Sequence, residues 1–220
     1  MTMKNQKGVI VAICVLSVLV VSSFFIFQFN AGASKDDARE KRAAVEQLIK
    51  EWLIQTSNPS TLKSSLPSDY RSAEAFQKLS GLSIDYLPYL IEVIEKDESL
   101  TSYNLIHAAT SVSKTKTDFP FARPHEWLDQ WKAFVAGIPS FHSSLKNSAD
   151  ALVSIDRITE LGAPIVPYLM DDVEEGNVTY VRALAEIVED PEMPQSDDLT
   201  EWNTWVKQNR AKYEPLRFQP

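Results

Sequence analysis

The three histidines are the side chains of this chain best suited to acid–base or metal chemistry, yet their surroundings favour neither. His107, His125 and His142 lie far apart, and none has metal-ligand spacing to another histidine, a cysteine or a carboxylate cluster. Serines flank His142, but neighbours along the chain do not produce the geometry of a nucleophile and its base. We therefore predict no catalytic residue, no metal site and no cofactor site.

The densest charge in the sequence is a group that we call the acidic run: Asp171, Asp172, Glu174 and Glu175. The ligand spacing of a calcium loop is not present there. Two interpretations stay open, a solvated helix end and a docking site for a basic protein partner. In the second case, charge reversal at Asp171, Asp172 and Glu175 is expected to weaken partner binding without unfolding the domain.

Four of the five tryptophans form two pairs at helical spacing. Trp127 and Trp131 are four residues apart, and Trp202 and Trp205 are three apart, so each pair shares one face of a helix. Packing between helices is one interpretation. The other is that a partly exposed pair forms a binding hot spot for a partner.

Helices must position these side chains, and the chain contains two similar sets of them. The stretch Leu87–Leu90 (Leu-Pro-Tyr-Leu) returns 79 residues later as Val166–Leu169 (Val-Pro-Tyr-Leu). The proline of each copy is expected early in a helix, where its missing N–H costs little. Gly81 and Gly162 stand where the preceding helices would end, as C-terminal caps do. The pattern predicts a stack of helical hairpins.

The second copy runs through Leu161–Leu169 to Val181–Ile187, which reads Val-Arg-Ala-Leu-Ala-Glu-Ile. This pattern resembles the HEAT-like repeat family over about residues 66–213. The first copy fits at Leu82–Leu90, but Tyr103–Ala109 lacks the Arg-Ala-Leu-Ala core. The resemblance implies a short α-solenoid of two units with a partner-binding role, and it implies no catalytic residues.

Residues 8–29 contain no charged side chain, and the 22 residues would span roughly 33 Å as a helix, enough to cross a hydrocarbon core of about 30 Å. We expect a transmembrane signal anchor there. A long signal peptide cleaved after Ala33, leaving a secreted domain, is the alternative. The basic tail over residues 1–7 favours a periplasmic or extracellular domain. Cys14, the only cysteine, lies inside this segment, so no disulfide is expected.

Residues 30–56 are predicted to form a stalk that becomes an amphipathic helix. The first part is charged on every face and is expected to be solvated. The second part carries an apolar stripe that is expected to dock on the repeats. The stripe consists of Val45, Leu48, Ile49, Trp52 and Leu53.

Composition favours an all-α fold, since the chain has only 6 glycines and few alternating β-branched residues. We place the two repeat units over residues 57–143 and 144–220, the second with an irregular tail from Tyr213. Beyond residue 34 there are 20 basic and 30 acidic residues, a net charge of −10. Such a surface repels phosphate backbones and excludes nucleic acid as a partner.

These features together predict a membrane-anchored helical-repeat adaptor or structural subunit that mediates protein–protein interaction at the cell envelope. Its partner would be another envelope protein, contacted through the acidic run and the tryptophan helices. We do not expect an enzyme. The alternative is a HEAT-like scaffold with lyase- or hydrolase-type activity on a bound small molecule.

Overall fold

The computed structural model describes residues 35–57, 67–97, 99–146 and 151–218, and these residues form helices joined by turns and loops. No strand occurs among them, which confirms the predicted all-α class. No helix in these ranges is long and apolar enough to cross a membrane. The predicted anchor over residues 8–29 and the cleavage site at Ala33 lie outside the described residues.

The chain divides into two compact units between Glu40 and Lys41. A helix covers residues 35–57, and the part that belongs to the second unit buries Val45, Ile49 and Trp52. The indole N–H of Trp52 donates a hydrogen bond to the Tyr70 carbonyl at 2.8 Å. The predicted stripe is therefore largely correct, except that Leu53 is exposed.

The prediction of a fully solvated first part of this helix is wrong at Lys41. Its side chain is buried and forms an ion pair of 2.9 Å with the buried Asp85. Beside it, Arg42 pairs with Glu92 at 2.8 Å and lies over the ring of Tyr89. Carboxylates of the domain therefore neutralise these cations and fix the helix in place.

The first group of helices follows the helix over residues 35–57. It consists of α2 (Pro67–Arg71), α3 (Glu74–Ser80), the 3-10 helix η1 (Ile84–Tyr86), α4 (Leu87–Lys96) and α5 (Leu100–Ser113). Gly81 caps the C-terminus of α3 as predicted, and its N–H bonds back to carbonyls of the last turn. Pro88 occupies the first turn of α4, where no intrahelical donor is lost.

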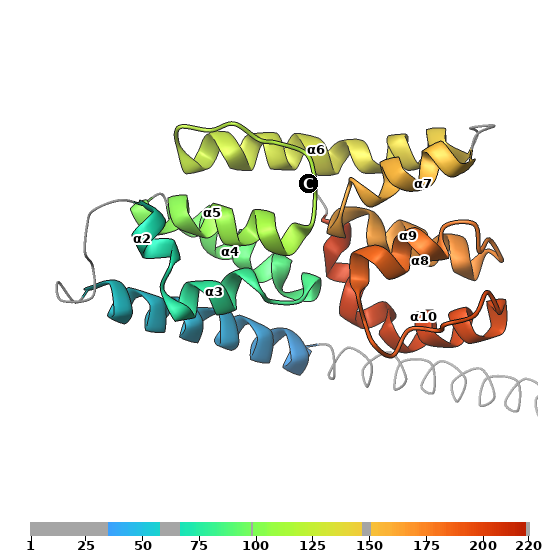
Figure 1. The fold of residues 1–220 in the computed structure, drawn as a ribbon, viewed down its shortest axis with the longest axis horizontal. Coiled ribbons are helices and arrows are strands. Elements are labelled where there is room, and N and C mark those ends of the chain that lie inside the picture. The colour runs from blue at the N-terminus through green and yellow to red at the C-terminus, as the bar shows by residue number, and fades with distance from the viewer. Residues whose placement is uncertain (1–34, 58–66, 98, 147–150, 219–220) are drawn as a thin grey trace, which may run out of the picture. The chain divides into compact units, whose positions relative to one another are not determined.

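The second group has a similar local order near the C-terminus (Figure 1). It consists of α7 (Ala151–Thr159), the 3-10 helix η2 (Ala163–Ile165), α8 (Val166–Glu174), α9 (Val181–Val188), α10 (Leu199–Tyr213) and the 3-10 helix η3 (Glu214–Arg217). Pro167 lies in the first turn of α8, as Pro88 does in α4. The tail predicted to be irregular thus begins with a turn of helix.

One long helix, α6 (Pro124–Lys146), contacts both groups. It packs on α4 and α5 of the first group and on α7 and η2 of the second, and Figure 1 shows it running past both. The predicted boundary between residues 143 and 144 falls inside this unbroken helix. The helix also continues through Pro139 in its interior.

The two groups approach each other closely at Gly162. We predicted a C-terminal cap, but this residue instead precedes η2 with φ +66° and ψ −148°, a conformation open to glycine alone. A Cβ atom there would lie 2.2 Å from the Ser113 carbonyl oxygen. The Lys116 N–H donates a hydrogen bond to the Glu160 carbonyl at 2.9 Å beside this contact. The turn before η2 is thus fitted against the loop after α5.

Candidate docking cleft

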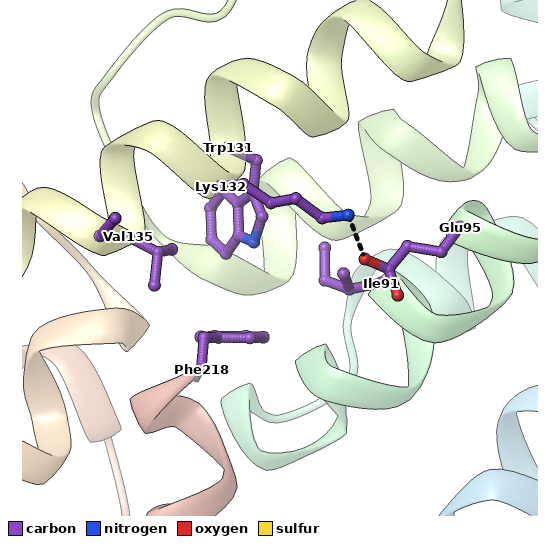
Figure 2. Close-up of a pocket in the computed structure, with 7 residues that line it drawn as sticks. Ile91, Glu95, Trp131, Lys132, Val135 and Phe218 are labelled. Carbon is purple, nitrogen blue, oxygen red and sulfur yellow. Dashed lines mark ion pairs between the residues drawn. The ribbon is translucent and has the colours of Figure 1, made fainter. Parts of the chain in front are cut away.

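A cleft of about 270 Å³ opens where α4, α6 and the end of η3 meet. Its floor and walls are mainly apolar, and Figure 2 shows the lining side chains pointing toward the common space. They are Ile91 and Glu95 from α4, Trp131, Lys132, Val135 and Ala136 from α6, and Phe218. Three segments that are distant in the sequence therefore build one hollow.

Aromatic rings form the wall on the α6 side. Trp131 stacks on Trp127 with ring centroids 5.4 Å apart and an interplanar angle of 8°. Phe119 and Phe218 contact Trp131 edge-on at 6.1 and 5.6 Å. Trp127 and Trp131 are each only 1% exposed, so they serve as a rigid backing rather than as protruding anchors. Trp131 is the member of the pair that lines the cleft.

An ion pair stands at the edge of this apolar space. Lys132 Nζ lies 2.9 Å from Glu95 Oε1, and both side chains remain substantially exposed (Figure 2). A pair so accessible to water contributes little to stability. It does give the cleft a donor and an acceptor with which to orient an incoming polar group.

Arg217 holds the backbone that carries Phe218. Its guanidinium donates to Glu214 Oε1 at 2.6 Å and to Asp171 Oδ2 at 2.9 Å, and it lies 4.6 Å from the ring centroid of Tyr168. Burial lowers the pKa of Arg217, but hydrogen bonds to Glu214 and Asp171 outweigh burial and leave it raised. The guanidinium therefore stays charged and fixes the end of η3 against α8.

The acidic run already has cationic partners within the domain. Asp171 pairs with Arg210 at 2.8 Å as well as with Arg217, and Arg210 also reaches Glu174 at 2.6 Å. Glu175 pairs with Lys146 at 3.2 Å. A basic partner docking here would have to displace these cations, so docking at the acidic run stays a prediction.

Asp172 differs from its neighbours because it is fully buried. Its Oδ2 lies 2.6 Å from His142 Nε2, and its Oδ1 forms an ion pair of 2.5 Å with Lys146. Hydrogen bonding to Asp172, ahead of that to Glu175, raises the pKa of Lys146. Charge reversal at Asp172 would therefore bury a new cation beside Lys146. Contrary to our expectation, that variant cannot probe the surface without damaging the fold.

The second tryptophan pair packs inside the second group of helices. Trp202 and Trp205 of α10 are both buried, with ring centroids 6.1 Å apart. The indole N–H of Trp202 donates to the Ser196 carbonyl at 2.7 Å, and Trp205 stacks on Tyr213. Their contacts are those of core residues, and their use as a hot spot stays a prediction.

Sequence reasoning missed Phe218, which lines the cleft, and the pairing of His142 with Asp172.

Comparison with known proteins adds no assignment: no protein-family model matches the chain, and neither a curated protein nor a solved structure matches it.

Proposed function

We propose that this chain is an envelope-anchored adaptor built on a short α-solenoid of two HEAT-like units. Its cleft between α4 and α6 would bind one large apolar side chain from a helix of a partner protein. The observation that supports this function best is the cleft itself, an apolar hollow backed by buried aromatic rings and bordered by an exposed ion pair. Such an arrangement matches the anchor pockets of protein interfaces.

The size of the cleft suits a single large side chain. Small-molecule sites usually enclose about 300 to 1,000 Å³, whereas an apolar cavity of about 150 Å³ already admits benzene. A hollow of about 270 Å³ therefore has room for one aromatic ring or branched aliphatic group.

The outer face of α6 supports a helical partner. Ala133, Ala136, Gly137 and Ser140 are exposed there, and nothing lies within 4 Å of the position that a Gly137 Cβ would take. Small side chains let a second helix approach closely, so that its large residue could reach the cleft beside Ala136. The anchor proposed over residues 8–29 would hold this face at the envelope.

A photo-crosslinking residue in the full chain tests the proposed function in the native host. Introduced at Ala136, which lines the cleft, it should give discrete protein adducts. Introduced at Arg182, which is exposed on α9 and does not line the cleft, it should give few or different ones. Adducts at position 136 should also disappear when Lys132→Glu reverses the charge at the edge. Identical adduct patterns at both positions would refute the assignment of the cleft.

A further inference from the structure

We propose that Phe218, at the end of the C-terminal strap Glu214–Phe218, gates the docking cleft, with its ring restricting entry and Arg217 fixing the part of the strap that precedes it. The nature of the group that enters rests on the proposed function. The gate itself does not, because access to the cleft can be measured without a partner.

Phe218 lies against the ring of Trp131, which forms the back of the cleft. Its ring meets Trp131 edge-on, with centroids 5.6 Å apart and an interplanar angle of 90°. Figure 2 shows it facing Trp131 across the space that Ile91 and Val135 also line. An aromatic group that entered to pack on Trp131 would compete with Phe218 for the same face.

The backbone at Phe218 is suited to movement. Its φ of +33° lies in the left-handed region, which bulky side chains rarely adopt. The ring contact with Trp131 accompanies this unfavourable backbone conformation, so a competing ring that displaced Phe218 would let the backbone relax. Phe218 is therefore held more weakly than the residue before it.

Arg217 supplies the fixed end of the strap. Two carboxylates, Asp171 and Glu214, and the ring of Tyr168 hold its guanidinium. Leu216 beside it is fully buried. A strongly held residue next to a strained one makes a hinge, and Phe218 can swing away while η3 stays in place. Asp171, which we expected to contact a partner, thus acts on access to the cleft indirectly, by holding Arg217.

The rate at which a cysteine in the cleft reacts with a water-soluble thiol reagent tests this gate. Val135→Cys places the thiol inside the cleft, and Cys14→Ser makes it the only thiol of the full chain. Adding Phe218→Ala should raise the labelling rate about tenfold. The loss of one edge-to-face aromatic pair changes the equilibrium between closed and open cleft by about that factor. Arg217→Gln should also raise the labelling rate, by a smaller factor. Arg182 is an exposed arginine elsewhere, and Arg182→Gln should leave the rate unchanged.

A second thiol position separates gating from general loosening. Ala133→Cys lies on the exposed face of α6, and its labelling rate should be unaffected by Phe218→Ala. If both thiols accelerate together, the domain has loosened and the gate is disproved. If neither accelerates, Phe218 does not limit access. Either result leaves the crosslinking test of the proposed function intact. That test measures contact with a partner in a protein whose Arg217 and Phe218 are unchanged.

Discussion

Gly162 joins the two groups of helices through backbone alone, and its lack of a side chain is what permits the contact. An added Cβ would lie 2.2 Å from the Ser113 carbonyl oxygen and 2.6 Å from the Thr115 nitrogen, and neither backbone atom can swing aside. Its φ of +66° adds conformational strain for any other residue. We expect Gly162→Ala to lower the free energy of unfolding by about 2 kcal/mol or more.

Urea denaturation of the full chain measures this loss, and Gly137→Ala is the matched control. Gly137 lies in the interior of α6 with open space around its Cβ position. Replacing it should stabilise the domain by up to about 1 kcal/mol through helix propensity. Equal losses at both positions would show that the contact at Ser113 is not the cause.

The pairing of His142 with Asp172 shows what sequence patterns miss at the residue scale. The two residues are 30 positions apart, and spacing rules relate only neighbours on one helix. The acidic run looked uniform in the sequence. On α8, however, successive residues turn to different faces, so Asp172 is buried while Asp171 meets Arg217.

Glu92 fastens the helix over residues 35–57 to α4, and this attachment depends on pH. Hydrogen bonds from Lys96 and then Arg42 hold the pKa of Glu92 below its ordinary value. Because the folded pKa is lowered, the pair stabilises the fold fully above the unfolded pKa of about 4.3. The contribution is lost as pH falls through the lowered folded value.

We therefore expect that Glu92→Gln makes the free energy of unfolding fall less steeply as the pH is lowered into the acid range. The loss at neutral pH should stay near or below about 1 kcal/mol, because water screens a partly exposed pair. Chemical denaturation between neutral pH and acid, for wild type and variant, measures both quantities. Parallel curves for the two proteins would mean that Glu92 does not cause the slope.

At the scale of elements, local chemistry predicted helix starts better than helix ends. Pro88 and Pro167 lie in the first turns of α4 and α8 as expected, where proline removes no intrahelical hydrogen bond. Gly162 looked like a cap, but close packing is what requires glycine there. The strap looked irregular because its stability comes from Arg217 and Leu216 contacts that no local pattern contains.

At the scale of the whole domain, composition was enough for the all-α class but not for the cleft. Helix propensity and apolar spacing are local properties, so each segment shows them without reference to the tertiary fold. The cleft combines Ile91, Trp131 and Phe218, which only the tertiary fold brings together. The tryptophan pairs were correctly placed on helix faces, yet which face is buried depends on helices that lie elsewhere in the chain.

The strap also couples the two groups of helices, because η3 contacts α4 in the first and η2, α8 and α10 in the second. Leu216 is fully buried at this junction. We expect Leu216→Ala to lower the free energy of unfolding by about 2 to 5 kcal/mol, the range for a truncated core leucine. Because the strap bridges both groups, amide hydrogen exchange should accelerate in α4 and α8 by similar factors. Ile54→Ala, at a side chain 63% exposed, should change neither. Acceleration confined to α8 and α10 would show that the groups unfold separately and that the strap does not couple them.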